Sequence, residues 1–309
     1  MFTSVAWLLA GFVALYYGAE WLVEGAVTIA NRTKISKAIA GVILVAFGTS
    51  APELFVNGIA ALQGETGLAL ANVSGSNLTN LLIGFGLCGV LSQLPVDATK
   101  FRHDLWTFTL APLVLLVVMW VMGHQLPIWG GGLLVLCFAT YLYLVKNRLG
   151  VDDEEDEPGS LKKGIVWFIV GISLLYVGGS LTVNRALEIG EFLSIDKTIL
   201  GLTVVAIGTS IPDVMASVIA AREGENDIAV GNLLGSNIFN VLFIISTTSL
   251  LSLRPLVGNF QVTLSYLVVV IASGAFFVWT ARSGRLSRGG GGLMILCYFA
   301  YIIYRIQFA

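Results

Sequence analysis

The chain has 309 residues, of which 56% are hydrophobic and only 12% charged, and its net charge is −2. Soluble domains carry roughly twice that share of charged residues, so lipid rather than water must surround most of this chain. The small net charge argues against nucleic acid as a partner. Three cysteines far apart in apolar runs argue against a disulfide framework, and two histidines away from any acidic cluster argue against a histidine metal site.

Ten apolar runs are long enough to cross a bilayer, which takes about 20 helical residues. We therefore expect an all-α integral membrane protein with ten transmembrane helices. No basic segment precedes the first run and no small-residue cleavage pattern follows it, which indicates a retained helix rather than a signal peptide. In chain order the runs cover residues 2–30, 38–62, 66–91, 105–123, 126–146, 163–190, 198–222, 227–252, 258–281 and 289–308.

Basic residues in the connecting loops predict the orientation, because cytoplasmic loops are enriched in lysine and arginine. With both termini outside, only four of the 17 basic residues fall on the outer side, namely Arg185, Lys197, Arg254 and Arg305. The acidic run DDEEDE at 152–157 then lies in a cytoplasmic loop, where we interpret it as a solvated linker. The sequence therefore predicts that both termini face outward.

The two halves of the sequence repeat each other at a shift of 160 residues. GTSAPE at 48–53 aligns with GTSIPD at 208–213, and GSNLTN at 75–80 aligns with GSNIFN at 235–240. The same shift pairs other positions, among them Asn72 with Asn232, and no gap is needed from the first run to the last. We infer the duplication of one five-helix unit.

A unit of five helices forces its second copy to enter the membrane upside down, because five is an odd number. Inverted repeats of this kind are typical of transporters, whose binding site lies near the membrane midplane where the repeats meet. We therefore predict a first repeat, an acidic cytoplasmic linker and a second repeat, over residues 1–146, 147–162 and 163–309.

Each proline motif carries a carboxylate inside an apolar run, Glu53 in the first copy and Asp213 in the second. A charge at the centre of a bilayer costs about 2.5–3.5 kcal/mol on insertion scales. No lysine or arginine lies deep within the second, third, seventh or eighth run to neutralise these carboxylates. A mobile cation, either a metal ion or a proton, must therefore do so.

The prolines of the two motifs supply further oxygen ligands. Pro52 and Pro212 each lack an N–H and push away the carbonyl four residues earlier, at Gly48 and Gly208. Freed carbonyls persist in a membrane where they find a partner or line a wet cavity. Carbonyl, hydroxyl and carboxylate oxygens then converge on one helical turn, which is the kind of shell that Ca²⁺ or Na⁺ prefers.

The GSN motifs add a second tier of polar groups. Ser76 and Asn80 lie four residues apart on one helix face, as do Ser236 and Asn240, and the glycine that opens each motif permits close helix approach. Small and hydroxyl residues often serve only to pack membrane helices. Two different motifs repeated at one register, each proline turn keeping a carboxylate, favour cation coordination instead.

In these motifs, G-T-S-x-P-E/D followed 22 residues later by G-S-N, the sequence resembles the Ca²⁺/cation antiporter superfamily, specifically its prokaryotic sodium/calcium exchangers. The resemblance covers essentially the whole chain. It implies ten helices in two inverted repeats, with the long first and sixth helices sliding across a core of the other eight. It further implies a secondary active antiporter of a prokaryotic inner or plasma membrane rather than an enzyme. Ca²⁺ and Na⁺ would be its substrates, with no cofactor and no obligate protein partner.

The resemblance also implies a set of ion ligands. Glu53 and Asp213 would bridge a central Ca²⁺, or share their charge among Na⁺ ions that exclude it. The backbone carbonyls of Ala46 and Ala206 would contribute to flanking Na⁺ sites. The side-chain ligands carried over are Thr49, Ser50, Glu53, Ser76 and Asn80 in the first repeat, and Thr209, Ser210, Asp213, Ser236 and Asn240 in the second.

Two positions depart from the family pattern. Many prokaryotic relatives have glutamate in both proline motifs, whereas the shorter Asp213 stands in the second motif here. Potassium-dependent exchangers have another aspartate at the position of Asn240, so we expect potassium-independent exchange. One Ca²⁺ or two Na⁺ neutralise two carboxylates, and the third Na⁺ that the family implies would make transport electrogenic.

Other functions stay open at this point. An antiporter that exchanges Ca²⁺ or another divalent cation for protons would use the same carboxylates, although the hydroxyl and amide ligands favour Na⁺. An intramembrane hydrolase would use Glu53 and Asp213 as a catalytic dyad, which the surrounding serine, threonine and asparagine fit less well. A passive channel would not hold an ion with so many ligands.

Two carboxylates of the first run fall outside the repeated site. The shift pairs Glu20 and Glu24 with Ser180 and Asn184, so their charge is not duplicated. They either line an ion passageway or face water near the membrane edge.

Overall fold

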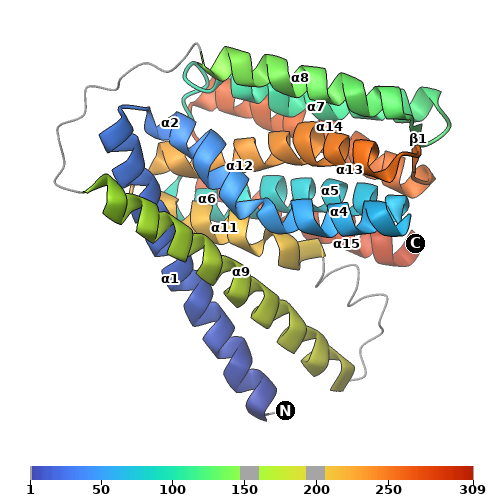
Figure 1. Cartoon of the computed structure of the whole chain (residues 1–309). Coiled ribbons are helices and arrows are strands. Elements are labelled where there is room, and N and C mark those ends of the chain that lie inside the picture. Colours follow the sequence, from blue (N-terminus) through green and yellow to red (C-terminus); the bar gives the residue numbers. More distant parts are fainter. Residues whose placement is uncertain (1, 147–159, 193–205, 309) are drawn as a thin grey trace.

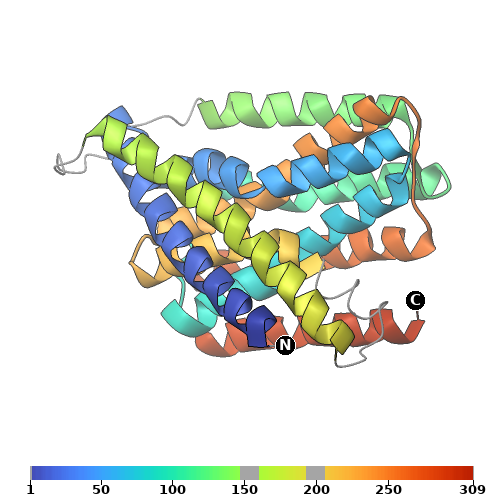
Figure 2. The same ribbon diagram turned by 60° about the horizontal axis from the view of Figure 1, so that its bottom comes forward.

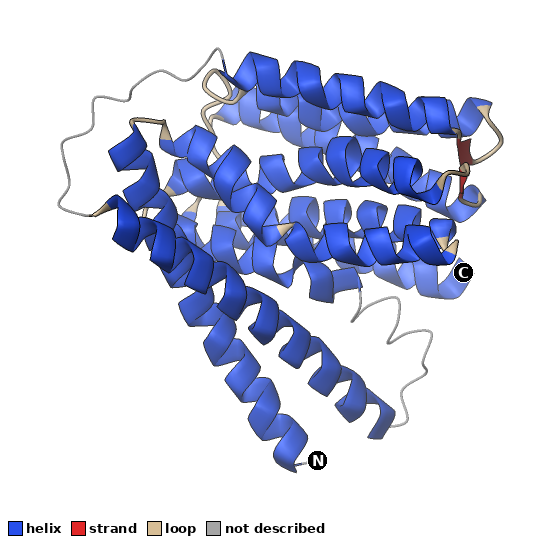
Figure 3. Ribbon diagram, in the orientation of Figure 1, coloured by secondary structure: helices blue, strands red, loops and turns tan. Residues whose placement is uncertain are grey.

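A computed structural model describes residues 2–146, 160–192 and 206–308, which are almost entirely helical (Figure 3). Among these residues, seven helices are long and apolar enough to cross a membrane, or eight if one bent pair counts as a single span. The all-α membrane class is thereby confirmed. The number of ten spans is not reached in the described part of the chain, and the run expected over 198–222 lies partly outside it.

The helices follow the apolar runs in order, and several runs consist of α-helix interrupted by a short π-helical segment (η). The first half contains α1 (Phe2–Thr33), α2 (Lys37–Ile39), η1 (Ala40–Val45), α3 (Ala46–Thr49), α4 (Ala51–Gln63), α5 (Thr66–Leu78), η2 (Thr79–Gly84), α6 (Phe85–Ser92), α7 (Arg102–Val121), β1 (Gln125–Leu126) and α8 (Ile128–Lys146). The second contains α9 (Leu161–Phe192), α11 (Ala206–Arg222), α12 (Asn226–Phe239), η4 (Asn240–Ile244), α13 (Ile245–Ser252), β2 (Leu256–Val257), α14 (Phe260–Ser283) and α15 (Arg288–Phe308).

Helices α1 and α9 lie side by side and run obliquely across one face of the remaining helices (Figures 1 and 2). Each has 32 residues and is about 48 Å long, which exceeds the hydrocarbon thickness of a bilayer and requires a tilt. Glycines bring the two backbones together, because a Cβ at Gly171 would lie 2.5 Å from the Leu22 nitrogen. The long, tilted first and sixth helices that the resemblance implies are therefore present.

The two halves repeat each other in backbone conformation as well as in sequence. Gly64 and Gly224, each ending a helix, have φ values of 79° and 85°. Gln93 and Leu253 end helices with φ values of 50° and 52°, a left-handed conformation that is uncommon for residues other than glycine. Both pairs are separated by the shift of the sequence repeat, so the repeat extends to the local structure.

Short β pairings join the halves at both ends of α7. Before α7, Pro95 forms a β-bridge with Arg285. After α7, strand β1 pairs antiparallel with β2, with Gln125 opposite Val257. At the shift of 160 residues, Pro95 corresponds to the residue just before β2, and Gln125 corresponds to Arg285. The two pairings are therefore related by the repeat, and they lie at opposite ends of α7, which has 20 residues.

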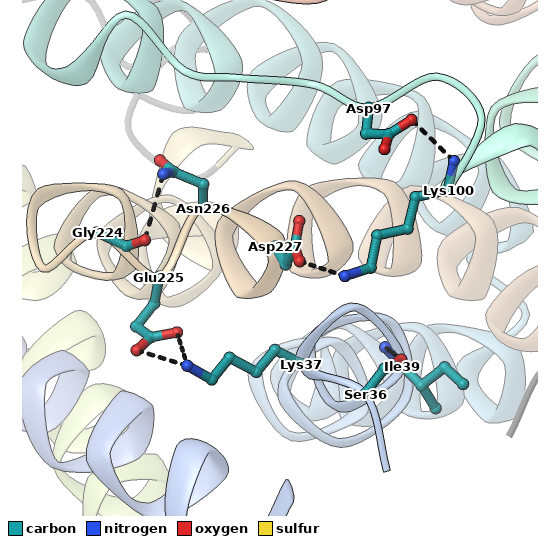
Figure 4. Close-up of polar contacts among 9 residues, drawn as sticks. All are labelled: Ser36, Lys37, Ile39, Asp97, Lys100, Gly224, Glu225, Asn226 and Asp227. Carbon is teal, nitrogen blue, oxygen red and sulfur yellow. Dashed lines mark hydrogen bonds and ion pairs between the residues drawn. The ribbon is translucent and has the colours of Figure 1, made fainter. Parts of the chain in front are cut away.

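Ion pairs gather at the end of the bundle where α12 begins (Figure 4). Lys37 Nζ lies 3.2 Å from Glu225 Oε2, and Lys100 Nζ lies 2.6 Å from Asp227 Oδ2. Both pairs are partly exposed and each contributes at most about 1 kcal/mol. They tie the start of α2 and the connection before α7 to the first turn of α12, on the side that the loop charges predict to be cytoplasmic.

Glu223, in the turn between α11 and α12, lies in an unfavourable electrostatic setting. Burial raises the pKa of its carboxyl group, and the nearby carboxylates Glu20, Glu225 and Glu24 raise that pKa further. A carboxyl whose pKa is higher in the folded than in the unfolded protein destabilises the fold when ionised, and this penalty disappears as falling pH protonates it. The E223Q variant should therefore have a higher melting temperature than wild type at about pH 8, with the gain shrinking towards about pH 4.

The measurement is thermal unfolding of the purified protein in detergent across this pH range. E65Q is the matched control, because it makes the same chemical change in the equivalent turn of the first repeat, between α4 and α5. A gain for E223Q that does not change with pH would contradict the electrostatic explanation.

Candidate functional site

The two proline motifs and the two GSN motifs meet in the interior of the bundle. The bent span α2–α4 and helix α11 carry the proline motifs, while α5 with η2 and α12 with η4 carry the GSN motifs. Of the ten side chains expected as ligands, nine are buried and Thr209 is half-buried. The structure thus brings residues from four distant parts of the sequence into one polar cluster, which we call the midplane cluster.

The two proline turns differ in shape. The first span bends by 46° between Lys37–Thr49 and Ala51–Gln63. Ser50 lies at the bend, with φ −87° and ψ 6°, and Pro52 follows in the first turn of α4. Pro212, by contrast, lies within α11, which is helical from Ala206 to Arg222. The span is therefore bent next to Pro52, whereas the helix continues through Pro212.

Asp213 is surrounded by hydrogen-bond donors. Asn80 Nδ2 donates to its Oδ2 at 2.7 Å, and Ser236 Oγ donates to its Oδ1 at 2.9 Å. The Ser50 hydroxyl lies at 3.5 Å from the same Oδ1. Three donors from both repeats suit a negatively charged carboxylate, which only accepts hydrogen bonds. Asp213 is thereby held in one orientation.

Glu53 has the opposite environment. Its side chain is fully buried, and neither Oε1 nor Oε2 has a hydrogen-bond partner. The neighbouring hydroxyls of Ser76 and Thr209 bond each other at 3.3 Å. A buried carboxylate without a close, well-aligned donor costs several kcal/mol when ionised, so its position requires either a bound cation or a proton.

Other oxygen atoms of the midplane cluster also lack a donor. The amide oxygens of Asn80 and Asn240 and the hydroxyl of Ser210 are buried without a hydrogen-bond partner. Among the described residues, no three histidine, cysteine, aspartate or glutamate side chains gather as a metal site. The cluster instead offers two carboxylates with hydroxyl and amide oxygens, which is a donor set for a hard cation such as Ca²⁺ or Na⁺.

The two expected carbonyl ligands have different surroundings. The Ala46 carbonyl accepts the Ser50 backbone N–H at 3.0 Å and lies 3.4 Å from the Thr49 hydroxyl. Ala206 is the first described residue of α11. The roles of both carbonyls as flanking Na⁺ ligands stay predictions.

A cavity of about 470 Å³ lies beside Thr49 and Pro52 of the first proline turn. A smaller cavity lies beside Thr209 of the second. It has a volume of about 180 Å³, and its lining includes Ser180 and Asn184 of α9, Thr209 and Pro212 of α11, and Pro52. Ser180 and Asn184 are the repeat partners of Glu20 and Glu24. These carboxylates lie away from the cluster, since Glu24 pairs at the surface with Lys163 at 3.3 Å and Glu20 lies near Glu223 in the turn between α11 and α12.

Several polar residues of the interior were not expected as part of the site. The Thr49 hydroxyl lies 3.1 Å from Asn232 Oδ1, and the Thr209 hydroxyl lies 3.4 Å from Asn72 Oδ1. Asn240 Nδ2 donates to Asn77 Oδ1 at 3.1 Å. Asn72 and Asn232 carried a detectable signal, because they are identical residues one repeat shift apart in apolar runs.

The family profile described as sodium/calcium exchanger protein matches residues 3–146 and 163–307. Inner membrane protein YrbG of Escherichia coli is 30% identical over 95% of this chain and 94% of its own length. Sodium/calcium exchanger MaX1 of Methanosarcina acetivorans is 26% identical over 96% of each chain. A solved structure of the sodium-calcium exchanger NCX_Mj superposes with a TM-score of 0.85 and 28% identity, covering 98% of both chains. This chain is a member of the sodium/calcium exchanger family.

Proposed function

We propose that this protein exchanges Na⁺ for Ca²⁺ across a prokaryotic inner or plasma membrane. The observation that carries the proposal is the fully buried Glu53 carboxylate without a hydrogen-bond donor, next to an Asp213 carboxylate that has three. One Ca²⁺ neutralises both charges and takes the oxygens of both repeats as ligands. Na⁺ ions compete for the same oxygens, so the two ions occupy the site in turn.

Competition for one site leads to antiport if the site opens to one side of the membrane at a time. The proposed architecture is ten helices in two inverted repeats, with both termini outside. Repeat-related β pairings at opposite ends of α7 support the inversion, and the long pair α1 and α9 supplies elements that slide across the other helices. An empty site of charge −2 crosses the low-dielectric barrier reluctantly, which couples the two ion movements.

The ligand assignment rests on the midplane cluster. Glu53 and Asp213 bridge the Ca²⁺, and the hydroxyl and amide oxygens complete its shell. Two carboxylates and an amide at Asn240, where potassium-dependent exchangers have an aspartate, support exchange without K⁺. Three Na⁺ against one Ca²⁺ then move one net charge per cycle. The side-chain set is Thr49, Ser50, Glu53, Ser76, Asn80, Thr209, Ser210, Asp213, Ser236 and Asn240.

The test is uptake of radioactive Ca²⁺ into proteoliposomes loaded with Na⁺, compared with proteoliposomes loaded with K⁺ or choline. We expect uptake that requires internal Na⁺, proceeds without K⁺ on either side, and increases when valinomycin and a K⁺ gradient make the Na⁺-loaded interior positive, because net positive charge leaves with the Na⁺. Uptake that ignores Na⁺ and follows an imposed pH gradient would instead establish exchange of Ca²⁺ for protons. In that case the same carboxylates would carry the protons.

A further inference from the structure

Asn232 of α12 forms hydrogen bonds to both proline turns. Its Nδ2 donates to the Asp213 backbone carbonyl at 3.0 Å and to Ser217 Oγ at 2.8 Å. A carbonyl only accepts hydrogen bonds, so the amide nitrogen must face Asp213 and the amide oxygen must face Thr49. The Thr49 hydroxyl, 3.1 Å from that oxygen, therefore donates to Asn232.

This contact determines what Thr49 offers to an ion. A hydroxyl has a single hydrogen, and the Val45 carbonyl at 2.9 Å is a competing acceptor for it. While the hydrogen points to Asn232, it does not occupy the Val45 carbonyl, and the Thr49 oxygen presents its lone pairs. Asn232 thus links the first proline turn to the second and orients a ligand.

Asn72, the repeat partner of Asn232, makes only part of this arrangement. Its Oδ1 lies 3.4 Å from the Thr209 hydroxyl, while its Nδ2 is buried without a hydrogen-bond partner. By analogy with Asn232, Asn72 Nδ2 would donate to the Glu53 backbone carbonyl. That carbonyl instead accepts a hydrogen bond from Asn57 Nδ2 at 2.7 Å. Asn232 thus uses both its amide nitrogen and its amide oxygen in hydrogen bonds, whereas Asn72 uses only its oxygen, although the two positions are equivalent in the sequence repeat.

We propose that Asn72 and Asn232 are positioning residues that alternate in linking the two proline turns by hydrogen bonds. Asn232 bridges Thr49 and the Asp213 turn in the conformation described here, in which the exposed Ser180 lines the smaller cavity beside Thr209. In the conformation open to the other side, Asn72 bridges Thr209 and the Glu53 turn, and Asn232 loses its bond to Asp213. The proposal rests on inverted repeats and thus on the proposed function.

The physical reason for the exchange is the inverted symmetry. Inversion converts a conformation open to one side into one open to the other by exchanging the conformations of the two repeats. A contact that identical residues make in one repeat and not in its partner is then expected to change over in the transition. Asn72 Nδ2 has no hydrogen bond here and gains one in the other conformation. That gain offsets the loss of the Asn232 hydrogen bond to Asp213.

The experiment measures the accessibility of two repeat-related cysteines in proteoliposomes. S180C reports on the cavity beside Thr209, and E20C occupies the equivalent place on α1. Both are placed in a background in which the more accessible native cysteines are removed (C137A and C297A) and labelled with a thiol reagent that does not cross membranes, supplied on one side at a time. The variants are N232A and N72A, measured with equal Na⁺ on both sides, so that the loaded site can change between the two conformations.

We expect N232A to lower the ratio of S180C to E20C labelling by about five- to thirtyfold, since one to two buried hydrogen bonds of about 1 kcal/mol each are lost in one conformation only. N72A should raise the same ratio by a similar factor. N232D tests the chemistry, because its carboxylate keeps the acceptor for Thr49 but repels the Asp213 carbonyl, so it should act like N232A.

Shifts in the same direction for both alanine variants, or no shift for N72A, would overturn the proposal. If N72A has no effect, the difference in hydrogen bonding between Asn72 and Asn232 would arise because Asn57 stands where the second repeat has Ser217. N72A should then change the labelling ratio only in the N57S background. Na⁺-dependent Ca²⁺ uptake by the wild-type protein is measured in the same kind of vesicle. This uptake tests the exchange function without either asparagine variant, so failure of the exchange function is distinguished from failure of this proposal.

Discussion

Replacing Glu53 with glutamine is expected to abolish Na⁺-dependent Ca²⁺ uptake while leaving the protein folded. Glutamine has nearly the same shape, so the buried space stays filled. The variant lowers the charge of the midplane cluster from −2 to −1, and a bound Ca²⁺ would then leave an uncompensated positive charge in the interior of the bundle. An unpaired buried charge costs about 3–5 kcal/mol, so we expect at least a 100-fold loss of uptake.

The matched variant D213N separates the transport role from the structural role. It also removes one charge, and its uptake should fall to a similar extent. Asp213, however, accepts hydrogen bonds from Asn80 and Ser236, whereas neither oxygen of Glu53 accepts one. Placing an amide N–H against those donors should lower the melting temperature, whereas E53Q should leave it unchanged or raise it.

Both variants are compared by Ca²⁺ uptake in proteoliposomes and by thermal unfolding in detergent. E53Q that still transports within about twofold of wild type would remove Glu53 from the ion site. Equal destabilisation by E53Q and D213N would show that the difference in hydrogen bonding between the two carboxylates does not hold in solution.

The sequence predicts well which side chains gather in the midplane cluster, but it predicts their hydrogen bonds poorly. Two apolar runs interrupted by proline and carboxylate, repeated at one shift, are sufficient to locate the cluster, because burying a carboxylate in lipid is too costly without a purpose. Which carboxylate has donors depends on side chains from four different helices. No pattern along the chain shows that Asn80 of the first repeat reaches Asp213 of the second.

The same limit explains why Asn72 and Asn232 were not expected in the site. Each lies one turn before a GSN motif in an apolar run, and from the sequence either reads as a packing residue. Only the spatial arrangement shows that Asn232 reaches both proline turns. The proline turns show a similar limit, since the same motif stands in both repeats whereas only the first span bends and the described helix α11 continues through Pro212.

Helix packing was easier to predict from the sequence than hydrogen bonding. A substitution at Gly235 is expected to lower both stability and transport. The glycine that opens each GSN motif was expected to allow close helix approach. At Gly235 this is confirmed, because a Cβ there would lie 2.4 Å from the Val42 carbonyl oxygen and 2.7 Å from the Ala46 Cβ. Backbone at that distance cannot move aside as a flexible side chain would.

G235A should therefore push α12 away from η1, which leads into the first proline turn. Overpacking of this kind costs about 1–3 kcal/mol, so the melting temperature should fall by several degrees. The displacement also moves Ser236 and Asn232 relative to Thr49, and we expect Na⁺-dependent uptake to fall by about tenfold or more as the ligand geometry is lost. Thermal unfolding and uptake are measured on the same preparation.

G58A is the matched control, because it makes the same chemical change in α4, where the nearest atom to an added Cβ is Leu251 Cδ1 at 4.0 Å. In a helix interior with free space, alanine is favoured over glycine by up to about 1 kcal/mol. G58A should thus raise the melting temperature and leave uptake near the wild-type level. Identical behaviour of the two variants would mean that α12 and η1 do not pack as closely in the membrane as described, and the contact between Asn232 and Thr49 would lose its structural basis as well.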